Sequence, residues 1–251
     1  MICLWQNQLD DYTLEASSEQ GNYPASYLQD PRLVMAWRTS GVSDETITID
    51  AGAGETITAN SIAIARHNLT SGATIKIQAN ATDAWGAPSI DETVTWDEDI
   101  ITDLFTNATG YRFWRFYFDD DANGDGYLEI GRLFLGTRLT MPKIEPGVDI
   151  PYQDSSVVST SISGESYGDE GVIVRAPAFR FPYLTDTERG NILSMWREVK
   201  KVKPIFLLVW EDSLDVEGAI YCRINQDELA FKKAAQPGVG WELEIEFTEV
   251  F

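Results

Sequence analysis

The sequence predicts a mainly β protein of two domains: a jelly-roll β-sandwich, followed by a smaller β-sheet domain with one packed helix. In the first half, short segments alternate apolar and polar residues, as strands buried on one face do. Turn residues separate these segments, and no long helical pattern interrupts them. Residues 141–151 then contain three prolines, which favour an extended, semi-rigid connection. We therefore place the domain boundary there, with domains at residues 1–140 and 141–251.

The strands of the first domain are predicted from their alternation. Residues 46–50, 61–65 and 73–78 each place apolar side chains at every second position. Residues 111–118 carry aromatic rings on both faces, which predicts a strand in the centre of a sheet. Residues 127–135 follow a turn rich in Asp and Gly and are predicted to be the closing strand.

The second domain is predicted to contain several strands and one helix. The strands lie at residues 155–163, 171–181, 205–210, 219–224 and 241–251. The polar residues 164–170 are predicted to form a loop between the first two of these strands. In the last strand, the alternation places three glutamates on the outer face: Glu242, Glu244 and Glu246.

The helix is predicted at residues 185–201. Thr185 and Glu188 have the spacing of a capping box, in which each side chain accepts a hydrogen bond from the other residue's free backbone N–H. Pro204 ends the helix. One apolar stripe recurs at helical spacing and predicts the packed face: Ile192, Met195, Trp196 and Val199.

The composition argues against several classes of partner. The chain has 40 Asp and Glu against 19 Lys and Arg, and the net charge of −21 is unfavourable for binding nucleic acid or anionic lipid. No apolar stretch approaches the ~20 residues of a membrane-spanning helix, so we expect no membrane insertion. The first residues lack the basic and apolar regions of a secretion signal, and we expect synthesis in the cytoplasm without a signal peptide.

The sequence contains no clear catalytic motif, and we expect no enzyme. His67 is the one histidine and lies at a predicted strand end, where a structural role is favoured over catalysis. Cys3 and Cys222 are either two buried thiols, which is the favoured interpretation, or one long-range disulfide. Two acid pairs are candidates for glycosidase carboxylates, against the favoured interpretation of solvated loop charge: Asp97 with Asp99, and Asp119 with Asp121.

The loop before the closing strand of the first domain has the ligand spacing of the first part of a calcium loop. The candidate calcium ligands are Asp119, Asp121, Asn123 and Asp125. Their oxygens alternate along the chain, and Gly126 allows a sharp bend. Arg132 stands where a helix–loop–helix calcium site needs a bidentate glutamate, so that architecture is not expected. The alternative is a tight turn in which Asp, Asn and Gly bond their own backbone.

Aromatic residues near predicted loops make a glycan site one alternative. Exposed aromatic rings offer an apolar face on which sugar rings stack, and three tryptophans are candidates: Trp37, Trp85 and Trp96. The other interpretation is that these rings are buried bulk, which is the more common situation for tryptophan.

Five segments of the first half carry a resemblance to a known family. They are residues 23–28 (YPASYL), 37–40 (WRTS), 47–50 (ITID), 62–69 (IAIARHNL) and 127–136 (YLEIGRLFLG). Over about residues 22–136 the chain resembles discoidin-type, galactose-binding-like β-sandwiches, including bacteriophage versions of this domain. The resemblance implies a galactose-binding-like jelly roll, and some relatives bind sugars or use calcium near the loops.

The second half resembles the C-terminal module of phage minor tail and tail-tip proteins. The likeness lies in residues 181–188 (FPYLTDTE), the helix with Trp196, residues 203–206 (KPIF) and the final strand. It implies a non-enzymatic structural component of a phage or prophage tail tip or baseplate, located in the virion. The implied partners are other tail and baseplate proteins and further copies in a homo-oligomeric ring.

The two resemblances together give a main hypothesis and an alternative. In the main hypothesis the second domain forms the ring around the distal tail. The first domain would project as a decoration or as a contact with a host-surface glycan. The alternative function is a glycan-binding, lectin-like module, assisted by calcium.

Overall fold

The computed structural model describes residues 1–209, 218–233 and 240–251. The chain divides into two compact units. The sandwich unit comprises Ile2–Leu139, Phe206–Ala219 and Phe251, and the helix unit comprises Met1, Thr140–Ile205 and Ile220–Val250. Phe206–Ala219, which follows the helix in the sequence, therefore belongs to the sandwich unit. The pattern of apolar residues does not predict this assignment.

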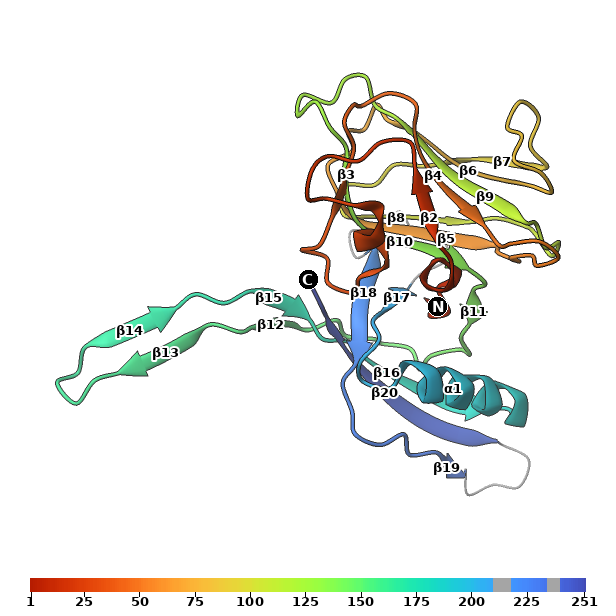
Figure 1. Ribbon diagram of the computed structural model, residues 1–251. Helices are drawn as coiled ribbons and strands as arrows, with labels where there is room; N and C mark the ends of the chain where they lie inside the picture. Colours follow the sequence, from red (N-terminus) through yellow and green to blue (C-terminus); the bar gives the residue numbers. More distant parts are fainter. Residues whose placement is uncertain (210–217, 234–239) are drawn as a thin grey trace. The chain divides into compact units, whose positions relative to one another are not determined.

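Two antiparallel sheets form the sandwich unit, and the predicted fold class is confirmed (Figure 1). The four-stranded sheet runs in the order β3 (Trp37–Arg38), β10 (Glu129–Gly136), β5 (Ser61–His67) and β8 (Ile100–Leu104). The five-stranded sheet runs in the order β2 (Leu14–Ala16), β4 (Glu45–Asp50), β9 (Phe113–Asp119), β6 (Thr74–Asn80) and β7 (Ile90–Val94). Neighbouring strands are mostly distant in sequence, as the jelly-roll prediction requires.

The core of the sandwich unit lies between these two sheets because the strands alternate. In β9, Trp114, Phe116 and Phe118 are fully buried, and the residues between them are half-buried on the outer face. The ring centroid of Phe118 lies 6.3 Å from that of Trp37, which comes from the opposite sheet. Strands β4 and β6 flank β9, so the prediction of a central aromatic strand is confirmed.

The other face of the four-stranded sheet is buried as well. The first five residues of β5 are buried, so side chains on both of its faces are covered. Phe134 of β10 packs edge-on against Phe206 of β17 (Ile205–Leu208), with ring centroids 6.0 Å apart. Strand β17 pairs with β1 (Ile2–Leu4), so the start of the chain helps to cover this face.

Arg132 is a buried cation on this second face of β10. Its Nη2 donates to Asp10 Oδ2 at 2.6 Å, and its Nη1 donates to the Leu28 carbonyl at 3.0 Å. Asp10 lies in the short helix η1 (Gln8–Asp11), and Leu28 lies in η2 (Ala25–Gln29). Arg132 therefore holds two N-terminal 3-10 helices on the sheet.

The helix unit is built around β20 (Trp241–Glu249), which pairs with β16 (Ala178–Leu184), β18 (Ala219–Ile224) and β19 (Lys232–Lys233). Strand β11 (Leu139–Thr140) lies at the boundary in sequence, with Leu139 in the sandwich unit and Thr140 in the helix unit. In β20 the apolar residues Leu243, Ile245 and Phe247 are buried, while Glu244 and Glu246 are exposed. The predicted alternation of this strand is confirmed, although Glu242 is half-buried.

Helix α1 (Asp186–Val199) contacts β16 and begins at the predicted capping box. The Thr185 hydroxyl accepts from the Glu188 N–H at 3.2 Å, and Glu188 Oε2 accepts from the Thr185 N–H at 2.7 Å. Three residues of the predicted stripe are buried, and the fourth, Trp196, is half-buried. No helix among the described residues is long and apolar enough to cross a membrane.

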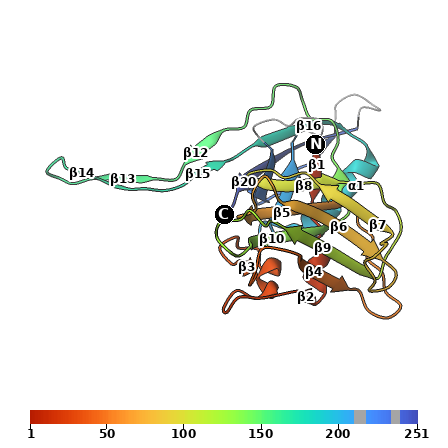
Figure 2. The ribbon, with the colours of Figure 1, turned by 90° about the horizontal axis from the view of Figure 1, so that it is seen from above.

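A long two-stranded ribbon extends from the helix unit (Figure 2). It consists of β12 (Tyr152–Asp154) paired with β15 (Ile173–Arg175), and of β13 (Val157–Thr160) paired with β14 (Ser166–Asp169). We call residues 152–175 the arm. The prediction of a loop at residues 164–170 is wrong, because β14 occupies most of this segment. The side chains of β14 are all exposed, so the strand shows no alternation of apolar residues.

The predicted strands at 155–163 and 171–181 are longer than the observed ones. The first contains β13, and the second is divided into β15 and β16. The predicted strand 205–210 ends at Leu208 in β17, and its last residue lies outside the described residues. Short strands such as β2 and β3 were not predicted, because two or three residues show no period.

Both cysteines are buried, and the structure contains no disulfide between them. Burial raises the pKa of the Cys3 thiol. The favoured interpretation of two buried thiols is therefore confirmed.

Candidate functional site

An aromatic and polar surface covers the outer face of the five-stranded sheet. The register of its strands aligns two rows of side chains on this face: Thr48, Arg115, Gln78 and Asp91, and beside it Thr46, Tyr117, Lys76 and Thr93. Trp85, from the loop between β6 and β7, lies against Arg115. We call Trp85, Arg115, Tyr117, Gln78 and Asp91 the Trp85 platform.

Arg115 is at the centre of the Trp85 platform. Its guanidinium carbon lies 4.4 Å from the Trp85 ring centroid and 5.8 Å from the Tyr117 ring centroid. Its Nε donates to Gln78 Oε1 at 2.8 Å, and its Nη2 donates to the same oxygen at 2.5 Å. Gln78 Nε2 in turn donates to Asp91 Oδ1 at 2.9 Å. This chain of hydrogen bonds fixes the guanidinium plane against the indole, so the surface is preorganised.

The polar ends of the two aromatic rings are also held. Trp85 Nε1 donates to Asp83 Oδ1 at 2.7 Å, and the Tyr117 hydroxyl donates to Asp44 Oδ1 at 2.5 Å. The bond to Asp44, burial and neighbouring carboxylates raise the pKa of Tyr117 to about 12. Burial lowers the pKa of Arg115. Both rings are half-buried, so part of each remains accessible to a ligand.

The structure separates the three tryptophans that were candidates for a glycan platform. Trp37 is fully buried, and its Nε1 donates to the Ser18 carbonyl at 3.0 Å. Trp96 packs against the sandwich core, and its Nε1 donates to the Leu69 carbonyl at 2.9 Å. Buried bulk is thus the right interpretation for Trp37 and largely for Trp96, whereas Trp85 lies on an outer sheet face.

The predicted calcium ligands have separate partners. Asp125 Oδ2 accepts from Asn68 Nδ2 at 2.9 Å, whereas Asp121 accepts from the Ser43 hydroxyl. The side chain of Asn123 donates to the Asn68 carbonyl at 2.9 Å. Within residues 1–209, 218–233 and 240–251, no group of three or more His, Cys, Asp and Glu side chains could hold a metal ion. Calcium binding by Asp119, Asp121, Asn123 and Asp125 stays a prediction.

The hydrogen bonds of this loop favour the tight-turn alternative. The Asn123 N–H donates to the Asp120 carbonyl at 2.8 Å, and Gly126 has a φ of +76°, which a turn needs. Asp120 is 1% exposed, and its carboxylate accepts from the Thr70 N–H at 2.8 Å and the Thr70 hydroxyl at 2.6 Å. Sequence reasoning missed Asp120, because its role depends on a turn about 50 residues away.

The acid pairs lie in exposed or turn positions. Asp97 Oδ1 accepts from the Asp99 N–H at 2.9 Å, and both residues are exposed. Asp119 is half-buried and Asp121 exposed; burial and the charges of Asp121 and Asp44 raise the pKa of Asp119. Solvated turn charge accounts for Asp97 and Asp99, as the favoured interpretation expects, whereas Asp119 is the half-buried last residue of β9.

His67, the last residue of β5, is expected to make the stability of the sandwich unit depend on pH. Burial lowers its pKa below the usual 6.5, against the opposing attraction of Asp97 and Asp99. As the pH falls through 6.5, the unfolded imidazole gains a proton that the folded one resists, so the free energy of unfolding decreases. The decrease is at most about 1.4 kcal/mol per pH unit and ends at the folded-state pKa.

The measurement is urea unfolding of the wild type and of His67→Gln between pH 8 and 5. The difference in unfolding free energy between the two proteins should be constant above pH 6.5. Below pH 6.5 the wild type should lose stability relative to His67→Gln. A difference that does not change with pH would show that the imidazole titrates alike in both states.

A second polar cluster, which the sequence did not indicate, joins β3 to β10. Arg38 lies with its guanidinium carbon 4.0 Å from the Tyr23 ring centroid and 4.8 Å from that of Tyr127. Its cross-strand partner Glu129 forms ion pairs with Arg38 and, at 3.2 Å, with Arg66. This cluster lies at the edge of the four-stranded sheet, where β3 is the outermost strand.

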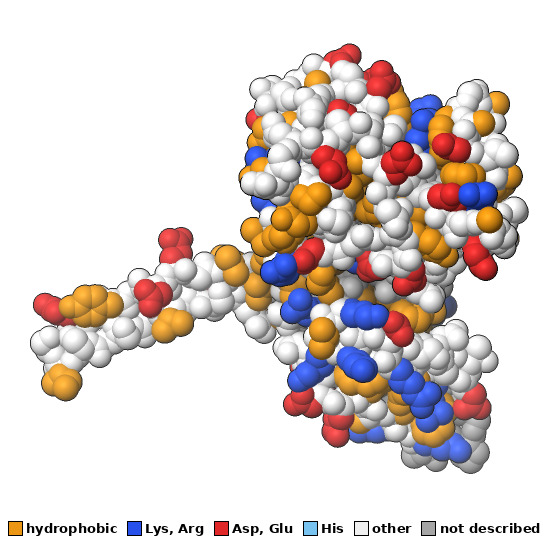
Figure 3. Space-filling view, in the orientation of Figure 1, with side chains coloured by type: hydrophobic (Ala, Val, Ile, Leu, Met, Phe, Trp, Pro, Cys, Tyr) orange, Lys and Arg blue, Asp and Glu red, His pale blue; other side chains and the backbone are white. Residues whose placement is uncertain are grey.

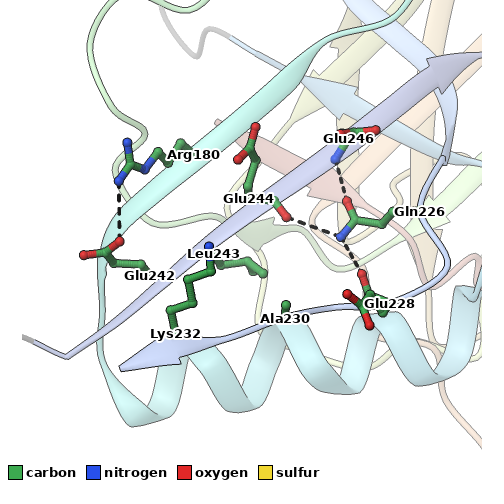
Figure 4. A pocket seen from close by; sticks show the side chains of 9 residues that line it. All are labelled: Arg180, Gln226, Glu228, Ala230, Lys232, Glu242, Leu243, Glu244 and Glu246. Carbon is green, nitrogen blue, oxygen red and sulfur yellow. Dashed lines mark hydrogen bonds and ion pairs between the residues drawn. The ribbon is translucent and has the colours of Figure 1, made fainter. Parts of the chain in front are cut away.

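The helix unit contains a pocket of about 360 Å³ beside the exposed face of β20 (Figure 4). Arg180 forms an ion pair with Glu242 at 3.4 Å across the pocket wall. Gln226 Nε2 donates to the carbonyls of Glu228 at 2.8 Å and Glu244 at 3.3 Å. None of its nine lining residues is aromatic, so it is a weaker candidate for a sugar site than the Trp85 platform.

Comparison with known proteins finds similarity in solved structures. No protein-family model matches the chain, and no curated protein matches it either. The family 32 carbohydrate-binding module of C. perfringens NanJ, in complex with galactose, is 19% identical, with a TM-score of 0.41 over 55% of this chain and 100% of that one. Chitosan-binding module 1 of a chitosanase/glucanase from Paenibacillus sp. IK-5 is 23% identical, with a TM-score of 0.41 over 52% and 98%.

A third similar structure is the lectin domain of lectinolysin in complex with the Lewis B antigen. It is 11% identical, with a TM-score of 0.41 over 53% of this chain and 96% of that one. None of these comparisons supports the tail-tip interpretation, which stays a prediction. The solved structures named here, to which about half of this chain is similar, are carbohydrate-binding modules and a lectin domain.

Proposed function

We propose that the sandwich unit is a glycan-binding module and that the Trp85 platform is its binding surface. The observation that supports this most directly is the guanidinium of Arg115 fixed against the half-buried Trp85 indole. The partly exposed aromatic surface can contact the C–H face of a sugar ring. The Arg115 guanidinium and the exposed Asp91 carboxylate beside it can donate to and accept from sugar hydroxyls, and the buried Gln78 holds both of them in place.

A neutral glycan fits this surface better than an acidic one. Two cations of the face are compensated by nearby acids: Lys76 pairs with Asp91 at 3.4 Å, and Arg112 pairs with Asp50 at 2.6 Å, whereas Arg115 donates to the neutral Gln78. The net charge of the chain is −21, so an anionic glycan would be repelled at long range. Binding is proposed to occur without bond cleavage, because Asp83 and Asp91 are held by Trp85, Gln78 and Lys76.

Truncation of the platform tests the proposal. The full chain is applied to a glycan array that includes galactosides, chitosan oligosaccharides, Lewis B and uronic-acid oligosaccharides, and hits are titrated by calorimetry. We expect Trp85→Ala and Arg115→Ala each to weaken binding at least about tenfold, which is about 1.4 kcal/mol. The control is Tyr23→Ala, which removes a comparably exposed aromatic ring from the Arg38 cluster and should leave the affinity unchanged.

Two outcomes would contradict the glycan proposal. An array without any hit for the wild-type chain removes the function itself. Loss of binding in Tyr23→Ala together with normal binding in Trp85→Ala places the site at the Arg38 cluster instead. Melting temperatures of all variants show whether a lost affinity reflects unfolding.

Assembly into a larger complex is a second candidate function, and the arm favours it. A two-stranded ribbon is at best marginally stable in water by itself, yet the arm exposes nearly all its side chains. Such a segment fits a role in contact with another protein. The phage-tail role predicted from the sequence is one form of this function. Purified virions and reconstituted tails that lack this chain would refute that role.

A further inference from the structure

The arm is the most apolar exposed surface of the helix unit. Among the described residues, seven of the twelve large hydrophobic side chains that are exposed lie on it: Tyr152, Val157, Val158, Ile162, Tyr167, Val172 and Ile173. Val158, for example, is 72% exposed. Clustered apolar side chains on a surface indicate an interaction site. The arm is therefore expected to be covered by a partner.

The arm is also acidic. Residues 152–174 contain Asp154, Glu165, Asp169 and Glu170 and no lysine or arginine. Across the ribbon, Asp169 is directly opposite Val157, and Tyr167 is opposite Ser159, so apolar and acidic groups share one face. A partner surface that fits the arm must therefore combine basic and apolar side chains.

The end of α1 carries such a surface. Arg197, Lys200, Lys201 and Lys203 are exposed there; Lys201 forms an ion pair with Asp227 and Lys203 one with Glu198, whereas Arg197 and Lys200 form none among the described residues. Between them Val202 is 69% exposed, and Trp196 is half-buried. We call residues 196–203 the basic patch. In Figure 3, Lys and Arg side chains gather on the helix unit, whereas the arm shows acidic and hydrophobic side chains.

The arm of one chain does not reach its own basic patch. At its base, the Arg175 N–H and Nε donate to the two carboxylate oxygens of Glu249, each at 2.9 Å. The Ala176 N–H donates to the Pro151 carbonyl at 2.9 Å and closes the ribbon beside this ion pair. The ribbon leaves the helix unit in the direction away from α1 in both views (Figures 1 and 2).

We infer that the arm docks on the basic patch of a second copy of this chain. Val157 and Tyr167 meet Val202 and Trp196, while Asp169 and Glu170 meet Arg197 and Lys200. The two surfaces of such a contact differ, so each copy can bind one neighbour through its arm and another through its patch. Contacts of this kind build a closed ring or an open chain. The inference rests on the assembly role and is independent of the glycan site.

Charge reversal on either surface tests the contact in the full chain. Variant one carries Asp169→Lys and Glu170→Lys on the arm, and variant two carries Arg197→Glu and Lys200→Glu on the patch. Sedimentation velocity from about 1 to 100 µM should show concentration-dependent association of the wild type and at least tenfold weaker association of each variant. When the two variants are mixed, each arm meets a patch of opposite charge, and association should return.

A matched control separates the contact from the net charge. Glu55→Lys with Glu98→Lys changes the net charge as much as variant one, at exposed sites of the sandwich unit, and should leave association unchanged. A wild-type chain that remains monomeric over the whole range overturns the inference, and the assembly role would then require a partner of different sequence. Wild-type association without recovery in the mixture overturns the inference and leaves the assembly role in place.

Discussion

Replacing Trp114 by alanine should lower the free energy of unfolding of the sandwich unit by about 3–5 kcal/mol. Trp114 lies in the central strand β9 and is fully buried. The ring centroids of Phe105 and Tyr111 each lie 6.2 Å from that of Trp114. Removing the indole leaves a cavity that a close-packed core fills only in part. Denaturant unfolding followed by circular dichroism measures the loss.

Trp114→Phe is the matched control for this variant. The indole N–H donates to the Ile57 carbonyl at 3.0 Å, but that oxygen also accepts from the Tyr111 N–H at 3.0 Å. Phenylalanine therefore leaves no carbonyl without a partner, keeps most of the bulk and should cost about 1 kcal/mol. An alanine variant as stable as the phenylalanine variant would show that Trp114 does not fill the core.

Replacing Arg175 by alanine should destabilise the helix unit by about 3–5 kcal/mol. The side chains of Arg175 and Glu249 are 13% and 10% exposed. The substitution therefore leaves the Glu249 carboxylate buried without the cation of its ion pair. Because this ion pair holds the base of the arm, limited proteolysis within residues 152–175 should also become faster. Denaturant unfolding and the rate of cleavage are the two measurements.

The double variant Arg175→Met with Glu249→Leu distinguishes a buried charge from lost packing. Replacing both charges by apolar side chains of similar size removes the desolvation cost together with the attraction, so it should be less destabilising than Arg175→Ala. If the double variant were the less stable of the two, specific hydrogen bonds of the pair would matter more than the isolated charge.

The longer strands of the sandwich unit could be predicted because burial on one face imposes a period of two. This holds for β4, whose buried residues alternate, and for β9, whose rings lie on both faces. The start of α1 could be predicted because a capping box is a local hydrogen-bond pattern. The ribbon of the arm could not be predicted, because its strands are exposed on both faces and bury nothing that would leave a pattern.

The candidate site shows the same division between local and long-range signals. Trp85 was a candidate from its position near a predicted loop. Arg115 was not a candidate, because it lies 30 residues from Trp85 in the sequence. The pairing of β6 with β9 and the loop that follows β6 bring the two side chains together. The charges of the arm and of the basic patch can be read from the sequence, but the sequence does not show that both segments are exposed.

The two native sulfhydryls are shielded from solvent, so reagents such as maleimides should react with them slowly. A new cysteine in place of Ile162, at the turn between β13 and β14, would then be the preferred labelling position. A fluorophore attached there would sense its surroundings at the far end of the ribbon while both natural sulfurs stay in place.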